Sequence, residues 1–213
     1  MEPERCGNPV VFTNQARCKD CYRCIRVCPV NAIGIRDGQA YVDQTRCISC
    51  GTCIRECPQH AKSFRRDLES VKELIDSDQV VAASLAPSFA AIFSEWQIRR
   101  LASALRTLGF AHVSETAVGA YHVAQETAEY ACQHRDRLCI GTACPAVVNY
   151  IERYRTDLVD HLVPIVSPMV AHARMLKEKL GPDAAVVFIG PFVAKKAEAQ
   201  DKSEGLVVYA LTF

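Results

Sequence analysis

The chain of 213 residues has almost no net charge and no long uninterrupted apolar run. A net charge of +1 gives no electrostatic reason to expect a nucleic acid or an anionic membrane as its main partner. The longest apolar stretch, residues 80–93, is broken by Pro87 and by two serines, and it is too short to cross a bilayer. The first residues lack the apolar segment of a signal peptide. We therefore expect a soluble, cytoplasmic protein.

Cysteine, in contrast, is abundant: the chain has twelve, and eight of them fall in two matching blocks. Residues 18–29 read CKDCYRCIRVCP and residues 47–58 read CISCGTCIRECP, so each block has the pattern C-x2-C-x2-C-x3-C-P. The second block repeats the first 29 residues later. This spacing is typical of proteins that hold two 4Fe-4S clusters.

Each of the two clusters is expected to draw on both blocks. Three thiolates of one loop wrap one cluster, whereas the fourth cysteine, which precedes a proline, serves the other cluster. The first cluster is therefore predicted to bind Cys18, Cys21, Cys24 and Cys57. The second cluster is predicted to bind Cys47, Cys50, Cys53 and Cys28. Metal–thiolate bonds would then replace much of the hydrophobic burial that so short a domain lacks.

Two other uses of the cysteines compete with this interpretation. Disulfides need an oxidising compartment, and nothing in the sequence predicts export of the chain. Zinc can be bound by paired C-x2-C motifs, but a zinc site does not require a third cysteine at the same spacing and a fourth before proline, twice over. Cys6 lies outside both blocks and is most simply a spare thiol.

Basic residues lie among and beside the eight cysteines. They are Arg17, Lys19, Arg23, Arg26, Arg46 and Arg55. They could dock an acidic redox partner, such as a ferredoxin or another electron carrier, or they could form a solvated basic face. The sequence alone leaves both alternatives open.

The sequence pattern divides the chain into three parts. Residues 1–66 form the α+β, dicluster ferredoxin-like domain, with a hairpin formed by residues 33–35 and 40–42. Residues 67–78 form an amphipathic connecting helix. Residues 79–213 alternate apolar strands with helices, which indicates an α/β domain with a parallel sheet.

The expected elements of the α/β domain are given by short apolar runs and by helical periodicity. Strands or extended segments are predicted at residues 80–85, 111–113, 138–140, 163–166, 185–189 and 206–213. Helices are predicted at residues 87–108, 117–134, 145–154 and 168–180.

Two segments that follow predicted strands are candidate sites, because α/β sheets bind ligands at the carboxyl ends of their strands. They are residues 142–145, which read TACP, and residues 190–198, which read GPFVAKKAE. Together with residues 86–88, 145–150 and 166–169, they resemble the FeFe-hydrogenases, also called iron-only hydrogenases. The resemblance covers nearly all of residues 79–213 and includes the preceding dicluster domain.

The resemblance implies roles for several side chains around an H-cluster, the catalytic metal group of that family. Cys144 matches the cysteine before proline that binds the 4Fe-4S part of the H-cluster. Lys195 matches the lysine that contacts the diiron part, and Glu198 matches the glutamate of the same motif. Glu126 and Glu129 match two acidic residues of a proton path.

The chain also departs from the family pattern, and the departures argue against an H-cluster. Ala143 replaces the proton-shuttling cysteine, as in sensory-type members, and Gly190 replaces a methionine. Phe192 stands where a second ligand cysteine is expected, and the third motif would lie beyond residue 213. Only Cys144 remains of four expected ligands, so a truncated domain is predicted, and a fragment without its own function is the alternative for this half.

The remaining cysteines of this half, Cys132 and Cys139, match no family ligand and are interpreted as core residues. The function predicted first is therefore electron transfer through two 4Fe-4S clusters. The alternatives are an enzyme that oxidises H2 or reduces protons, and a sensor of H2 or redox state that acts on a signalling partner.

Overall fold

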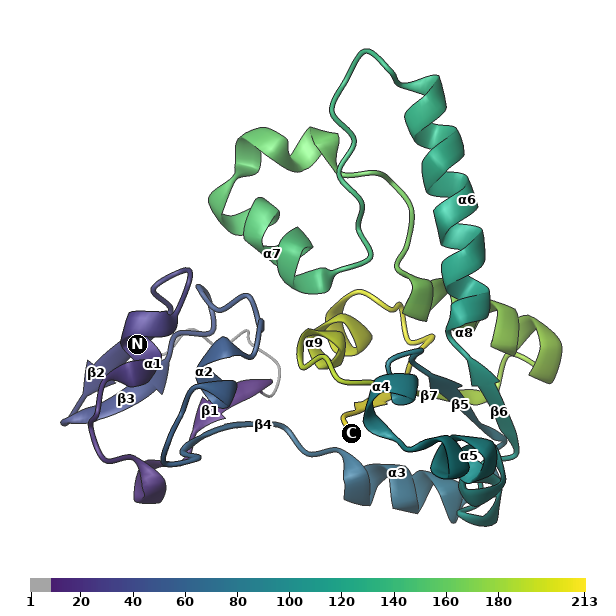
Figure 1. Cartoon of the computed structure of the whole chain (residues 1–213), viewed down its shortest axis with the longest axis horizontal. Coiled ribbons are helices and arrows are strands. Elements are labelled where there is room, and N and C mark those ends of the chain that lie inside the picture. Colours follow the sequence, from purple (N-terminus) through teal and green to yellow (C-terminus); the bar gives the residue numbers. More distant parts are fainter. Residues whose placement is uncertain (1–8) are drawn as a thin grey trace. The chain divides into compact units, whose positions relative to one another are not determined.

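The computed structural model describes residues 9–213, so Cys6 lies outside the described residues. Contacts divide the chain into two compact units (Figure 1). The first unit holds the described residues up to Arg65 together with the segment Phe192–Ala197, and the second holds Arg66–Pro191 and Glu198–Phe213. As the sequence predicts, a small ferredoxin-like domain precedes an α/β domain with a parallel sheet.

The first unit consists of two copies of one motif, related by the 29-residue repeat. Its elements are β1 (Val11–Thr13), η1 (Gln15–Arg17), α1 (Arg23–Val27), β2 (Ile33–Arg36), β3 (Gln39–Val42), α2 (Thr52–Arg55) and β4 (Lys62–Phe64). Strand β1 pairs antiparallel with β4, and β2 pairs antiparallel with β3. The hairpin between β2 and β3 turns at Asp37 and Gly38, whose φ angles of 51° and 76° lie in the left-handed region that this turn requires.

The core of the first unit is small and contains part of the cysteine set. Buried apolar residues from three strands, among them Val11, Ile33 and Ala40, pack with the thiols of Cys24 and Cys53. So few apolar side chains cannot offset the chain entropy lost on folding, which agrees with a domain stabilised by bonds to metal.

The second unit is organised around a four-stranded parallel sheet with the order β6-β5-β7-β8. Its strands are β5 (Val81–Leu85), β6 (His112–Glu115), β7 (Ala185–Ile189) and β8 (Tyr209–Leu211). Every residue of β5 and β7 is buried, because helices cover both faces of the sheet. Two central strands that are buried along their whole length, and apolar except for Ser84, are what the sequence predicts for such a sheet.

The helices of the second unit are α3 (Leu68–Ile75), α4 (Phe89–Ile92), α5 (Glu95–Thr107), α6 (Ala117–Gln133), α7 (Pro145–Tyr154), η2 (Thr156–His161), α8 (Pro168–Leu180) and α9 (Ala194–Asp201), whose first residues belong to the first unit. Helix α8 packs Met169 and Ala173 against one face of the sheet. Helices α3 and α5 pack Val71 and Leu105 against the other face.

Helix α6 lies close against α8, as Figure 1 also shows. At Gly119 an added Cβ would come within 2.6 Å of the Pro168 carbonyl oxygen and 2.8 Å of the His172 backbone nitrogen. Glycine at position 119 is therefore required by the close approach of two backbones.

His172 is buried, and its ring nitrogens lie 2.8 Å from Ser84 Oγ and 3.0 Å from Ser114 Oγ.

Two sequence predictions for this unit are wrong. Residues 138–140 form no strand, because Leu138 is 56% exposed and only Ile140 makes a single bridge, to Leu162. The helix predicted at residues 87–108 is interrupted at Phe93, which has the extended backbone that separates α4 from α5. In both places the apolar pattern is a local property of the sequence, whereas the backbone conformation depends on contacts with distant parts of the chain.

Among the described residues, no helix is both long enough and apolar enough to span a bilayer.

Candidate iron–sulfur centres

Two cavities in the first unit are each lined by four cysteines. The first encloses about 350 Å³ of space, part of it open to solvent, and its cysteines are Cys18, Cys21, Cys24 and Cys57. The second encloses about 310 Å³, and its cysteines are Cys28, Cys47, Cys50 and Cys53. Each cavity therefore brings together three cysteines of one block and the last cysteine of the other, which are the two sets that the spacing predicts.

The loops that present the cysteines follow the same backbone path in both halves. Left-handed φ angles occur at Asp20 and Ser49, at Tyr22 and Gly51, and at Asn31 and His60, and the members of each pair are one repeat apart. Tyr22 and Gly51 are the residues from which α1 and α2 begin. Residues other than glycine rarely adopt this conformation, so its recurrence indicates that the cysteine arrangement determines the backbone.

Glycine suits position 51 because its φ of 78° lies in the left-handed region, and an added Cβ would meet only ordinary contacts. The equivalent residue Tyr22 adopts a φ of 55° with its full side chain.

Backbone N–H groups point at several of the sulfurs. Cys28 Sγ accepts a hydrogen bond from the Ala32 N–H at 3.2 Å, and Cys57 Sγ accepts one from the Ala61 N–H, also at 3.2 Å. Cys47 Sγ accepts one from the Ser49 N–H at 3.4 Å. Such donors stabilise negative charge on a thiolate that binds iron.

Burial affects the thiols unequally. It raises the pKa of Cys53 to about 12, with the neighbouring Cys47 thiolate adding to the effect. Burial also acts to raise the pKa of Cys57, but the backbone N–H groups of Lys62, Ala61 and Gln59 outweigh it, and the pKa is lowered. Because iron binds the thiolate, metal binding at Cys53 must release a firmly held proton.

A single metal ion fits these cavities less well than a larger group. Within residues 9–213, no three side chains of histidine, cysteine, aspartate or glutamate come close enough to share one ion. The four cysteines are instead spread around a space that suits a cluster of several irons and sulfides.

The candidate residues of the second unit are arranged differently. Cys144 is exposed and lies at the residue from which α7 begins. A separate cavity of about 500 Å³ is lined by residues that include Thr142, Pro145 and Glu198, and Glu198 is buried. Lys202, on the same lining, forms an ion pair with Glu152 at 2.6 Å.

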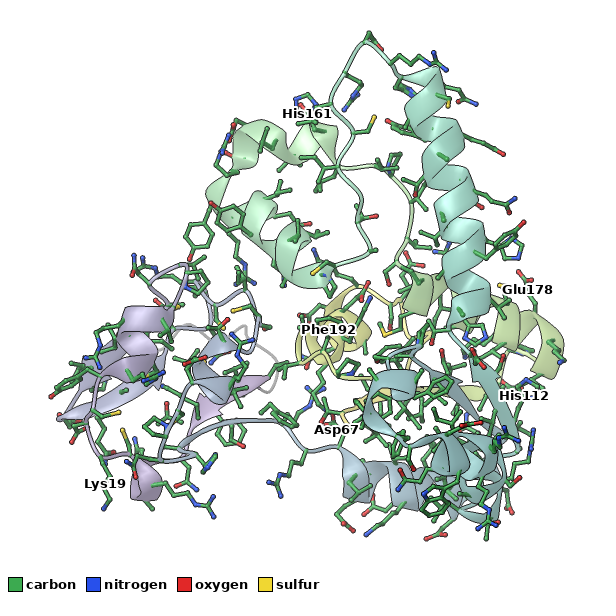
Figure 2. All side chains as sticks on the ribbon, in the orientation of Figure 1. Lys19, Asp67, His112, His161, Glu178 and Phe192 are labelled. Atoms are coloured by element: carbon green, nitrogen blue, oxygen red, sulfur yellow. The ribbon has the colours of Figure 1, made fainter. Side chains whose placement is uncertain are left out.

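The other family-matched residues do not line this cavity. Lys195 is buried and belongs, like Phe192, to the segment that contacts assign to the first unit. Phe192, labelled in Figure 2, has 62% of its surface exposed. Glu126 and Glu129 are exposed on α6.

The interpretation of the remaining two cysteines as core residues needs correction. Cys132 is exposed near the end of α6, whose buried residues, Gly119 and Val123, lie in the first half of the helix. Cys139 is only partly buried, in the extended loop that replaces the expected strand.

Both parts of the chain match known protein families. Residues 79–213 match the family model described as the C-terminal domain of the iron-only hydrogenase large subunit. The chain belongs to the iron-only hydrogenase large-subunit family. Residues 13–61 match a 4Fe-4S dicluster domain, and they contain all eight block cysteines. This hydrogenase-family chain is therefore an iron–sulfur protein.

The residues of this hydrogenase-family chain do not fit an H-cluster. Within residues 79–213, the resemblance matches two positions to cysteine ligands, and only one of them holds a cysteine, the exposed Cys144. The other position is Phe192, whose aromatic ring cannot bind iron. The ferredoxin-like domain, in contrast, provides four thiols at each of its cavities.

One residue near the iron–sulfur cavities was missed by the sequence analysis. Lys62 lines the first cavity although its side chain is only 3% exposed. Comparing the two halves of the repeat could have found it, because the equivalent position in the first half is Ile33.

Proposed function

We propose that this hydrogenase-family chain transfers electrons through two 4Fe-4S clusters in its ferredoxin-like domain. The first cluster is held by Cys18, Cys21, Cys24 and Cys57. The second is held by Cys47, Cys50, Cys53 and Cys28. The observation that carries the proposal is the lining of the two cavities, each with three cysteines of one block and one of the other.

The chain's own residues position the cysteine thiols and stabilise the negative charge of the thiolates. The two loops hold three thiols each, and the short helices α1 and α2 carry the last cysteine of each block toward the other cavity. Backbone N–H groups stabilise the thiolates. The bound clusters would supply one-electron redox chemistry, without proton transfer or bond cleavage.

The crossed arrangement can be tested by counting iron after anaerobic reconstitution. The wild-type chain should hold about eight irons, and Cys21→Ala alone should leave about four, since each cluster contains four. Cys21→Ala combined with Cys57→Ala should also leave about four, because both thiols line one cavity. Cys21→Ala combined with Cys28→Ala should leave almost none, because the two thiols line different cavities.

The control is Cys132→Ala, which changes an exposed thiol on α6 and should leave the iron content unchanged. If Cys21→Ala with Cys28→Ala left about four irons and Cys21→Ala with Cys57→Ala left almost none, each block would bind its own cluster. Electron paramagnetic resonance of the reduced samples should give 4Fe-4S signals whose intensity follows the iron content.

We also propose that the electron donor or acceptor is a small carrier protein, such as a ferredoxin, in the cytoplasm. Arg17, Arg26, Arg46 and Arg55 are exposed on the first unit, and the repeat relates Arg17 to Arg46 and Arg26 to Arg55. Such a basic surface favours an acidic partner, and its contribution to the association rate should fall as salt is added.

Hydrogen chemistry is a second candidate function, favoured by the family match over residues 79–213. It includes an H2 or redox sensor that acts on a signalling partner. Because the residues present do not fit an H-cluster, we expect no H2 oxidation or proton reduction by this chain after treatment with hydrogenase maturation proteins. Measurable H2 uptake would favour this second function over electron transfer alone.

A further inference from the structure

The two halves of the ferredoxin-like domain match in strand register as well as in cysteine spacing. Val11 pairs with Phe64 across β1 and β4, and the equivalent pair across β3 and β2 is Ala40 with Ile35. Each cavity is therefore bordered by equivalent strand positions, and Val11 lines one cavity where Ala40 lines the other. A difference between equivalent positions can make the two cavities chemically unequal.

One such difference lies directly beside the first cavity. Thr13 pairs with Lys62 across β1 and β4, whereas the equivalent pair across β3 and β2 is Val42 with Ile33. Both Lys62 and Thr13 line the first cavity, and Ile33 lines the second. An apolar pair in one half is thus replaced by a polar, charged pair in the other.

The Lys62 side chain is held inside the domain. It is 3% exposed, and its Nζ donates hydrogen bonds to Thr13 Oγ1 at 2.5 Å and to the Ala40 carbonyl oxygen at 3.5 Å. Both acceptors are neutral, so they hold the ammonium group in place without cancelling its charge. A charge screened so little by solvent acts strongly on nearby groups.

We propose that Lys62 makes the two clusters unequal by raising the reduction potential of the cluster held by Cys18, Cys21, Cys24 and Cys57 above that of the other. This inference rests on the proposed function. The step is the uptake of one electron from a carrier protein, which is oxidised by one electron, with no bond broken and no proton required. The fixed positive charge of Lys62 stabilises the added negative charge, so the first electron resides on the first cluster.

Burial raises the pKa of Cys24, which lines the first cavity, and the charge of Lys62 opposes that rise. At Cys57, in the same cavity, burial also acts to raise the pKa, but backbone N–H groups and the charge of Lys62 act against it, and the pKa is lowered. Lys62 also acts on Cys53 of the second cavity, after the larger effects of burial and of Cys47. Because the Lys62 side chain lines the first cavity and is not among the residues that line the second, its charge should raise the potential of the first cluster more than that of the second.

The experiment compares redox titrations, monitored by electron paramagnetic resonance, of reconstituted wild-type and variant chains. Lys62→Ile with Thr13→Val converts the polar pair into an apolar pair like that of the other half. At a fixed applied potential, the reduced-to-oxidised ratio of the higher-potential cluster should fall at least tenfold, which is 59 mV for one electron. The reduced-to-oxidised ratio of the lower-potential cluster should change less.

Three further variants serve as controls. Lys62→Gln removes the charge but keeps an N–H donor for Thr13, and it should reproduce the tenfold fall. Lys62→Arg keeps the charge and should restore the wild-type titration. Ile33→Lys with Val42→Thr places the polar pair beside the second cavity, so it should raise the reduction potential of the lower-potential cluster instead.

Iron content separates the possible failures. A wild-type chain that binds no iron refutes the proposed function itself. Fully loaded Lys62→Gln and Lys62→Ile chains whose two potentials equal those of the wild type refute only the role of Lys62. If the reduction potential also falls in a fully loaded Lys62→Arg chain, the inference is overturned, because the effect then comes from packing rather than from charge.

Discussion

The buried His172 predicts that the α/β domain loses stability in mild acid. Both ring nitrogens contact serine hydroxyls, with Ser84 Oγ at 2.8 Å from Nδ1 and Ser114 Oγ at 3.0 Å from Nε2. Ser84 Oγ also lies 2.8 Å from Thr116 Oγ1, so the ring belongs to a buried polar network between α8 and the sheet. Burial lowers the pKa of His172 to about 4, and the nearby His112 acts in the same direction.

The sign and size of the effect follow from the difference between this value and the ordinary histidine pKa of about 6.5. Between pH 6.5 and pH 4 the unfolded chain binds a proton at this position and the folded chain does not, so acid favours unfolding. The free energy of unfolding should fall by about 2 kcal/mol between pH 7 and pH 5 from this group alone. The loss stops growing near pH 4, where the folded state also binds the proton.

Urea denaturation at pH 7 and at pH 5, monitored by helical circular dichroism, measures this loss. His172→Gln removes the titrating ring, so its free energy of unfolding should change about 2 kcal/mol less between the two pH values than that of the wild type. His122→Gln is the matched control, because His122 is exposed on α6 and should lose stability as the wild type does. Equal losses for the wild type and His172→Gln would refute the reasoning.

Two further predictions concern packing and metal. Gly119→Ala should lower the free energy of unfolding by about 1–3 kcal/mol, because the new methyl group would lie 2.6 Å from a carbonyl oxygen, whereas Gly141→Ala meets no atom within 4 Å and should leave it unchanged in urea melts. Removal of iron by a chelator should abolish the tertiary structure of the ferredoxin-like domain but preserve most of the helical circular dichroism, which comes from the longer helices of the α/β domain. A parallel loss of both signals would contradict the second prediction.

The arrangement of the cysteines could be predicted from the sequence because their spacing is a local property of each loop. C-x2-C-x2-C allows three thiols to surround one cavity, and the proline after the fourth cysteine prevents the preceding short helix from continuing. The central strands could also be predicted, since residues 185–189 are apolar throughout, residues 81–85 are apolar except for Ser84, and such runs indicate a strand covered on both faces.

The errors occur where distant contacts decide the structure. The apolar run at residues 138–140 resembles a strand, but in the fold its backbone reaches only Leu162, by one bridge. The exposure of Cys132 depends on which part of α6 packs against the rest of the domain, and helical periodicity does not predict that for a weakly amphipathic helix. Lys62 was missed because a single basic residue among many has no pattern until the two halves are compared.

The crossed cysteine sets have a consequence for how the protein is made. Neither half of the ferredoxin-like domain can complete a cavity with its own cysteines, since the first cavity requires Cys57 and the second requires Cys28. At about 5–20 residues per second, a ribosome adds Cys57 roughly one and a half to six seconds after Cys28. During that interval the first three thiols of the nascent chain are open to oxidants and to competing metals. The first cavity can therefore hold a cluster with all four of its cysteines only after Cys57 has been added.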